Sequence, residues 1–200
     1  MNRRVKTGSM ALCAVLLLAC SGNKGNKEEE RILSDKPIKT EVLGLKLCDV
    51  CERATINSTI SKTQSLWFTS EQQDFGAYST VRCSPNAAQF PYGGMAWHYV
   101  DVDLNQKSQI VRITLMASYE SLDQAKDHFE GAKGILSNKY GKGNDRQEGT
   151  CMLWTDNTNT VGTFYYEGST IYGQDRSFCG MYYINIALAD AVEAASQPDV

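Results

Sequence analysis

The side chains best suited to chemistry in this sequence are two closely spaced thiols, in Cys48-Asp49-Val50-Cys51. A C-x-x-C pair at the start of a helix can carry out thiol-disulfide exchange, because the helix dipole stabilises the attacking thiolate. The surrounding residues predict a short strand, 43–47, and then a helix from about Asp49 to about Lys62. The strands that follow are joined mainly by hairpins, whereas thioredoxin-like redox motifs lie near βαβ units. Thiol redox chemistry at Cys48 and Cys51 therefore stands as an alternative to a structural role.

The folded part contains three further cysteines, Cys83, Cys151 and Cys179. Disulfides are expected if the chain is exported, as its N-terminal residues predict (see below), and five cysteines leave at least one thiol without an internal partner. The phases of the predicted strands favour Cys151 with Cys179, and Cys83 with Cys48 or Cys51. No second close pair completes a zinc site. We expect neither a metal nor another cofactor.

The residues that could serve as acids or bases are few. His98 and His128 are the only histidines, and we expect His98 to be a hydrogen-bonded interior residue. Asp101 and Asp103 share a strand face beside a turn, where paired carboxylates usually only increase solubility. The sequence has no G-x-S-x-G, P-loop or H-E-x-x-H motif. These observations favour a protein that is not an enzyme.

The N-terminal residues predict export. Arg3, Arg4 and Lys6 precede an apolar run, 10–19, and the next residues are polar. This pattern is that of a signal peptide, 1–19. A membrane-spanning helix needs about 20 apolar residues, so the run is too short to remain as a span.

The residues Leu17-Leu18-Ala19-Cys20 resemble the bacterial lipobox. The resemblance implies that Cys20 becomes the N-terminus and carries the lipid, including palmitate. Ser21 after the cysteine is similar to the pattern of outer-membrane lipoproteins. The expected location is the cell envelope, with the protein held on the periplasmic side of the outer membrane or on the cell surface.

The rest of the chain divides into three parts. Residues 20–38 are rich in Gly, Asn, Lys and Glu and predict a solvated tether; residues 39–190 suit one domain, and 191–200 a flexible tail. The chain has 20 basic and 23 acidic residues, and loss of the leader removes three basic ones, which changes the net charge from −3 to −6. This charge argues against nucleic acid as a partner.

The domain is predicted to be α+β. Its surest element is a helix over 121–140, with Ser121 as N-cap and one apolar stripe. Alternating residues predict strands, and polar residues predict one long loop, 167–178. Two helices on one face of an antiparallel sheet of about six strands would make a two-layer sandwich. The expected strands after the first helix are 75–83, 95–104, 109–117, 150–156, 160–166 and 179–188.

Three short motifs carry a family resemblance: Leu43-Gly44-Leu45-Lys46-Leu47, Gly93-Gly94 and Asn138-Lys139-Tyr140-Gly141. They resemble small bacterial envelope lipoproteins related in style to the SmpA/OmlA and β-lactamase-inhibitor-protein folds. Those folds are helix pairs on antiparallel sheets. The resemblance implies a binding, assembly or inhibitory role.

Strand alternation also predicts which side chains the helices leave uncovered. These are aromatic residues and methionines, and such sets usually mark an interaction site. The expected partner is another envelope protein; a glycan or lipophilic small molecule is a third possibility, and a second small core is the structural alternative. The predicted binding-face residues are Trp97, Tyr99, Met116, Met181 and Tyr183.

Overall fold

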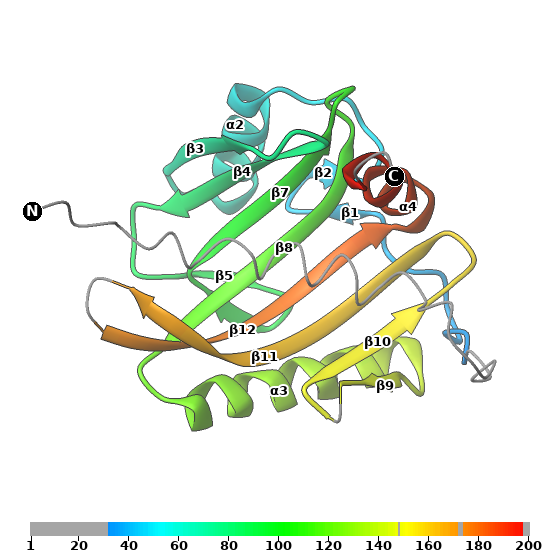
Figure 1. Ribbon diagram of the computed structural model, residues 1–200. Coiled ribbons are helices and arrows are strands. Elements are labelled where there is room, and N and C mark those ends of the chain that lie inside the picture. The colour runs from blue at the N-terminus through cyan, green and yellow to red at the C-terminus, as the bar shows by residue number, and fades with distance from the viewer. Residues whose placement is uncertain (1–31, 148, 172–173, 198–200) are drawn as a thin grey trace, which may run out of the picture.

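An antiparallel sheet of eight strands forms the centre of the fold, in the order β3-β4-β7-β8-β12-β11-β10-β9 (Figure 1). The computed structural model describes residues 32–147, 149–171 and 174–197. Two small hairpins, β1-β2 and β5-β6, lie outside the large sheet. The strands of the large sheet are β3 (Phe68–Asp74), β4 (Tyr78–Pro85), β7 (Tyr99–Asn105), β8 (Ile110–Tyr119), β9 (Asn144–Arg146), β10 (Cys151–Thr155), β11 (Asn159–Ile171) and β12 (Gln174–Asn185).

The two halves of the chain repeat one arrangement. The first half is α2 (Arg53–Gln64) followed by β3, β4, β7 and β8, and the second is α3 (Leu122–Tyr140) followed by β9 to β12. Each set of four is consecutive in the sheet, and the last strands of the two sets, β8 and β12, pair antiparallel at the centre. The sheet order of one half is thus the reverse of the other.

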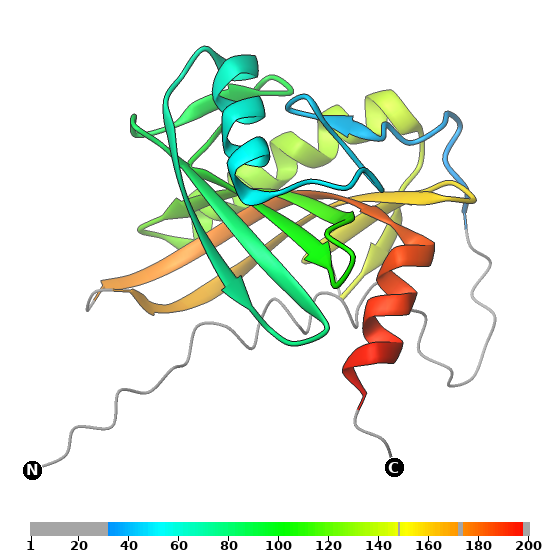
Figure 2. The same ribbon diagram turned by 90° about the horizontal axis from the view of Figure 1, so that it is seen from above.

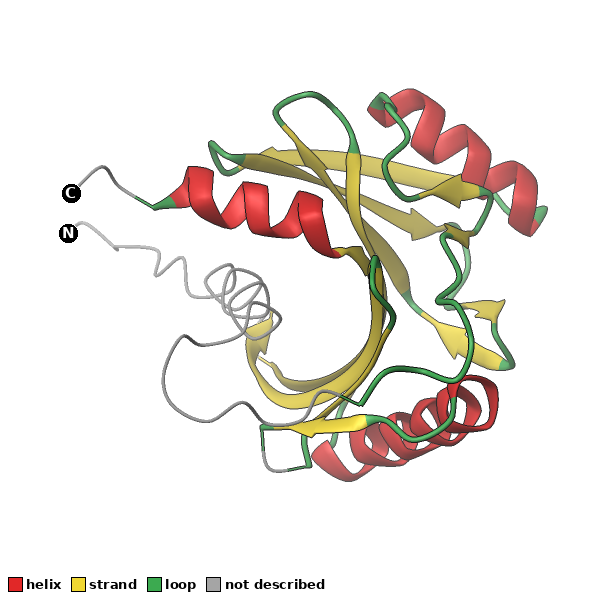
Figure 3. Cartoon of the chain, turned by 90° about the vertical axis from the view of Figure 1, so that its right-hand side faces the viewer, coloured by secondary structure: helices red, strands yellow, loops and turns green. Residues whose placement is uncertain are grey.

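The helices lie on both sides of the sheet. Figure 2 shows α2 and α3 above it and α4 (Ile186–Ser196) below it. The sheet curves strongly around the side of α4 (Figure 3), and we call this side the concave face. The α+β class with a large antiparallel sheet is confirmed, but there are eight strands instead of about six, and the described part contains a third helix.

The sequence accounts well for α3. Ser121 accepts a hydrogen bond from the Gln124 amide, as an N-cap does. The buried side chains of α3 recur at steps of three and four, which is the spacing of one helix face. They are Ala125, Phe129, Ala132, Leu136 and Tyr140.

The start of α2 differs from the prediction. The helix begins at Arg53, after an N-cap Glu52 whose side chain makes no capping bond. Asp49 lies in the preceding loop, where its amide bonds the Lys46 carbonyl. The C-x-x-C loop instead runs beside residues 108–110, because the amides of Cys48 and Cys51 bond the carbonyls of Ile110 and Ser108.

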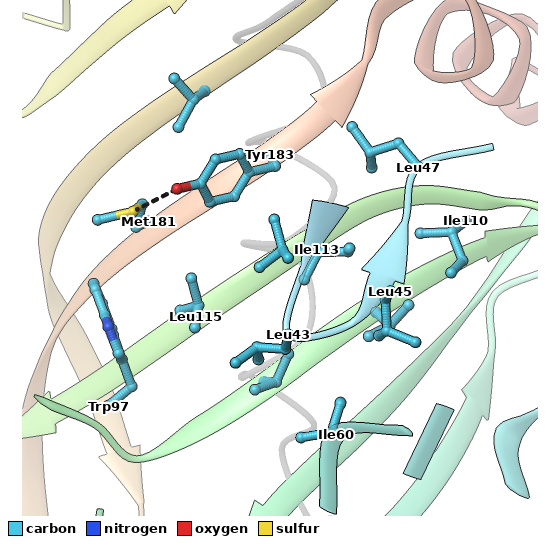
Figure 4. Close-up of a cluster of buried hydrophobic side chains, with 14 of the residues drawn as sticks. Leu43, Leu45, Leu47, Ile60, Trp97, Ile110, Ile113, Leu115, Met181 and Tyr183 are labelled. Carbon is cyan, nitrogen blue, oxygen red and sulfur yellow. Dashed lines mark hydrogen bonds between the residues drawn. The ribbon is translucent and has the colours of Figure 1, made fainter. Parts of the chain in front are cut away.

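The main core lies between the sheet, α2 and α3. It also includes both small hairpins, β1 (Glu41–Val42) with β2 (Leu45–Lys46), and β5 (Phe90–Tyr92) with β6 (Met95–Trp97). We call it the helix-side core, and Figure 4 shows part of it. The expected strand 43–47 is this first hairpin, since Leu43 and Gly44 have positive φ and form its turn.

Two strands of the large sheet were not predicted, and most of one predicted loop is strand instead. The edge strand β3 is polar, with five of its seven residues exposed, and the edge strand β9 has only three residues. The expected loop 167–178 is mostly the far end of the β11-β12 hairpin, where the strands pair beyond Glu167 through a register shift.

The end of the domain is helical. The predicted strand 179–188 stops at Asn185, which caps α4 by accepting a bond from the Leu188 amide. The helix takes up residues assigned to that strand and most of the expected tail, 191–200. Its Ala-rich sequence has high helix propensity, which outweighs the alternation read as a strand.

The segment expected to form the end of the tether packs on the body. Leu33 pairs with Thr155 of β10, and Ile38 is 4% exposed within the helix-side core. Asn144 of β9 exchanges two hydrogen bonds with the backbone of Ile32. The leader, Cys20 and the rest of the tether lie outside the described residues.

Candidate functional site

The β4-β7-β8 part of the concave face contains two adjacent ion pairs. Arg82 binds Asp101 through two hydrogen bonds of 2.8 Å, and Arg112 lies 2.5 Å from an Asp103 oxygen. Thr80 also donates to Asp103, at 2.6 Å. We call Arg82, Asp101, Asp103 and Arg112 the ion-pair strip.

The strip corrects the prediction that Asp101 and Asp103 only increase solubility. Both are buried, with 6% and 3% exposure. Burial raises the pKa of Asp101, and the hydrogen bonds and charge of Arg82 oppose this shift. Two carboxylates face two guanidinium groups, so the strip carries no net charge. Buried ion pairs of this kind can favour one specific conformation of the folded protein, while their net contribution to its stability is small.

The β11-β12 part of the concave face is aromatic. Its rings lie side by side, with centroid separations of 6.0 Å for Tyr182 and Phe164, 6.0 Å for Phe164 and Tyr166, and 5.2 Å for Tyr166 and Phe178. The planes of Phe164 and Tyr166 differ by only 10°. We call these four residues the aromatic row. Phe164, Phe178 and Tyr182 are almost fully buried, and Tyr166 is half-buried.

Gly162 and Gly180 leave space on the strand backbone for two rings of the row. A Cβ added at Gly180 would come within 2.3 Å of the Phe164 ring, and one at Gly162 within 2.5 Å of Tyr182. Both contacts join directly paired residues of β11 and β12. Each ring can therefore lie flat on the backbone of the neighbouring strand, with its other face toward the concave side. Such pairs are a known way to stabilise glycine within a sheet.

The predicted binding face is partly wrong. Tyr99 and Met116 do lie on the concave face, where Tyr99 packs under the Arg82 guanidinium at 4.2 Å. Trp97, Met181 and Tyr183 instead belong to the helix-side core (Figure 4), with at most 4% exposure.

Two features caused this error. The strand expected over 95–104 breaks at His98, so Trp97 belongs to the β5-β6 hairpin and its indole donates to the Tyr92 carbonyl. In β12 both faces are buried and apolar, so the sequence has no polarity difference with which to assign the phase. The aromatic row was missed for the same reason. Its signal was the alternation of glycine and aromatic residues in 162–168 and 178–182.

The C-x-x-C loop lacks the features of a redox site. Burial and the nearby Asp49 raise the pKa of both Cys48 and Cys51. A thiol that attacks disulfides at neutral pH instead needs a lowered pKa. Both cysteines are free thiols, Cys48 exposed and Cys51 partly buried against the helix-side core.

The predicted Cys151-Cys179 disulfide is incompatible with the fold. Cys151 lies on β10 and Cys179 on β12, with β11 between them, so about 10 Å separates the two strands. Their side chains also lie on opposite faces of the sheet, because Cys151 packs on the concave side and Cys179 against Phe129 of α3. A bridge needs a Cα separation below about 7 Å.

Cys83 is a buried free thiol whose pKa burial raises to about 12. It lies in the helix-side core, the cluster against which Cys51 packs. Its pairing with Cys48 or Cys51 stays a prediction.

Both histidines, His98 and His128 of α3, lie close to the ring of Tyr119. His128 Nδ1 is 2.5 Å from the Tyr119 hydroxyl, and its buried Nε2 has no hydrogen-bond partner. Burial, with a smaller effect from His98, lowers the pKa of His128 to about 4. His98 is half-buried and accepts a hydrogen bond from the Ser118 amide, at the break between β6 and β7. Neither histidine faces the concave side.

Other functional features are few in the described part. Its residues contain no group of three or more His, Cys, Asp or Glu side chains placed to hold a metal ion. No helix among them has both the length and the apolar character to cross a membrane. A shallow depression of about 710 Å³ lies at the C-terminal end of α3, on the opposite side of the sheet from the aromatic row, and its lining mixes polar residues such as Asn138 and Lys142 with the apolar Ile32 and Met152.

Comparison with known proteins gives no relative. No family model, no curated protein and no solved structure matches the chain. The concave face is therefore the part of the described structure that best indicates a function.

Proposed function

We propose that this chain is a non-enzymatic binding module of the bacterial envelope, anchored to the outer membrane by a lipid on Cys20, that binds its ligand on the concave face. An assembly or inhibitory role would follow from the identity of that ligand.

The observation that supports this proposal is the difference between the two faces of the sheet. Side chains of α2, α3 and both small hairpins fill the helix-side core. On the concave face, the aromatic row and the ion-pair strip lie on neighbouring strands, and α4 is the one described helix that packs there, through Ala189 and Val192. A curved apolar surface with a few fixed polar groups beside it is typical of binding sites.

Site-specific photo-crosslinking in cells tests the proposal. A benzoylphenylalanine in place of Tyr166 lies in the aromatic row, and the same residue in place of the exposed Lys126 lies on α3 as a matched control. We expect adducts at position 166 and few at 126. Equal adduct yields at the two positions, or none at 166, would contradict the proposal.

The anchor is tested separately. Cells given labelled palmitate should label the protein, and Cys20→Ser should abolish the label and release the protein from the membrane fraction. Persistence of the label in Cys20→Ser would show that the lipid is attached elsewhere.

The thiol redox alternative has less support, because a raised pKa slows thiolate chemistry at neutral pH. It predicts that Cys48 reduces an aromatic disulfide reagent faster than an unfolded control thiol does. A slower reaction would remove this alternative.

A further inference from the structure

We propose that the outer edge of β3 is a docking site for an extended, basic strand of an envelope protein, which adds to the large sheet beside residues 70–74. This inference goes beyond the proposed function, because it assigns a second surface, at the rim of the sheet, that recognises a partner mainly through backbone groups.

The large sheet has two edges, and one of them is long and open in the described part of the chain. The edge strand β9 has three residues, and the backbone of Ile32 exchanges two hydrogen bonds with Asn144 of that strand. The edge strand β3 has seven residues and is the outermost strand at its end of the sheet (Figure 1). An edge strand of this length is a template for pairing with another chain.

The two ends of β3 show which of its backbone groups face outward. At one end, the Phe68 amide donates to the Ser61 hydroxyl at 3.2 Å, and its carbonyl accepts from the Asn57 side chain at 3.0 Å, so both groups face away from β4. At the other end, the Phe75 amide bonds the Tyr78 carbonyl and closes the hairpin with β4. In an antiparallel pair, groups that face the partner alternate with groups that face away. The even-numbered residues of β3 therefore face outward.

Three residues of β3 offer backbone groups at this edge: Ser70, Gln72 and Asp74. The register of β3 with β4 has no shift over the whole strand, so the alternation holds to its end. Within the described part of the chain, no hydrogen bond engages the amides or carbonyls of these three residues. The Ser70 side chain accepts from Arg53 of α2 at 3.3 Å, so α2 covers only the Phe68 end. The open edge is thus about 17 Å long, which suits a short added strand.

The charges of this edge favour a basic partner. β3 contains Glu71 and Asp74 and no basic residue, and neither carboxylate forms an ion pair with another described residue. Arg82 lies opposite Glu71 in β4 but is held by Asp101 through two hydrogen bonds. Opposite charges on paired strands stabilise a sheet, and like charges destabilise it. A second copy of this chain is disfavoured for the same reason, because its β3 carries the same acidic side chains.

An exposed tryptophan lies at the end of the edge. The side chain of Trp67, directly before β3, is 71% exposed, more than any other large hydrophobic side chain in the described part. Its carbonyl accepts from the Asn86 amide, so its backbone continues the line of β3. Tryptophan is enriched among the residues that dominate the energy of protein interfaces. Trp67 therefore supplies an apolar anchor beside the backbone groups of the edge.

The test uses the purified mature chain with Cys20→Ser and, as probe, a short synthetic peptide, blocked at both ends, that alternates lysine with valine. Amide hydrogen exchange followed by NMR is the readout. In the free protein, the amides of Ser70, Gln72 and Asp74 should exchange quickly and those of the odd-numbered residues slowly. Saturating peptide should slow exchange at these three amides at least tenfold. A peptide with glutamate in place of lysine should bind at least tenfold more weakly.

Variants at one position separate the backbone from the side chain. Gln72→Pro removes an outward amide without removing a bond to β4, so it should fold normally and weaken peptide binding at least tenfold. Gln72→Thr keeps the amide and is the matched control, since both variants lose the bond from the Gln72 side chain to Ser79. It should bind normally. If Gln72→Pro does not fold cooperatively, Glu71→Lys with Asp74→Lys replaces it and should reverse the preference between the two peptides.

The outcomes are distinct. Failure of the lysine peptide to slow exchange at the three amides, or equal binding by Gln72→Pro and Gln72→Thr, would overturn the inference. Protection of the same amides that appears without peptide and grows with protein concentration would show that a second copy occupies the edge, which also overturns it. Gln72→Pro should leave adduct formation at position 166 unchanged, so this inference and the proposed function can fail separately.

Discussion

At the scale of the residue, the concave face combines buried charges with buried rings. Arg112 and Asp103 are among the most buried charged side chains of the described part, with 7% and 4% side-chain exposure. Such a pair adds little net stability, yet loss of one member leaves the other charge without compensation. The strip therefore restricts which substitutions the face tolerates.

Arg112→Met tests this at one position. We expect the free energy of unfolding to fall by about 3–5 kcal/mol, because Asp103 keeps its burial and loses its guanidinium partner. Urea denaturation measures the change. Lys133→Met is the matched control, since its ion pair with Glu130 is largely exposed and its loss should cost less than about 1 kcal/mol. Similar losses of unfolding free energy in the two variants would show that removing Arg112 does not leave a costly unpaired charge on Asp103.

His128 makes stability depend on pH. Its pKa is about 4 in the folded protein and 6.5 without the fold, so the unfolded chain binds more protons between these values. Its stabilising contribution is present above pH 6.5 and is lost as the pH falls toward 4. After allowance for solvent screening, we expect a loss of roughly 1–2 kcal/mol.

Denaturation of wild type and His128→Phe from pH 7 to 4 measures this effect. The variant should show a shallower decline, because it has no proton to gain at this position. Tyr119→Phe keeps the histidine and removes its hydrogen-bond partner, so its decline should remain. Parallel curves for wild type and His128→Phe would contradict the assignment.

At the scale of the element, local signals predicted those parts whose pattern is unambiguous. The helix 121–140 is confirmed within one residue of its start, because its cap and its stripe agree. The hairpin of β7 and β8 and that of β10 and β11 are confirmed as antiparallel pairs. The strand before α4 was extended too far, because Asn185 can continue a strand or cap a helix.

The cap of α4 gives a prediction for this element. Asn185 accepts a bond of 3.1 Å from the Leu188 amide and donates one of 3.2 Å to Asn159. Asn185→Ala should lower stability by about 1 kcal/mol, whereas Asn185→Asp should retain most of the capping effect. Thermal unfolding measures both. An unchanged melting temperature for Asn185→Ala would show that α4 is held by its packing alone.

At the scale of the whole molecule, the mirrored order of the strands decides which cysteines can meet. Cys151 and Cys179 cannot pair across the intervening strand. Burial also raises the pKa of Cys179 to about 12.

Chemical mapping of the cysteines tests this arrangement. Alkylation at pH 8 should modify Cys48 first, and should modify the buried Cys83, Cys151 and Cys179 only after unfolding. Peptide mapping of the protein from the cell envelope should find no disulfide between Cys151 and Cys179. Detection of that link would contradict the sheet order.

Composition and local pattern were sufficient for the α+β class, α3 and the central hairpins, because each has one periodicity and one matching cap or turn. The polar edge strands, the phase of β12 and the cysteine contacts were decided only by the tertiary structure. An edge strand needs no apolar pattern, and a strand buried on both faces has no polar side to reveal its orientation. The aromatic row belongs to this second group, since its rings become a continuous surface only when Gly162 and Gly180 lie across from them.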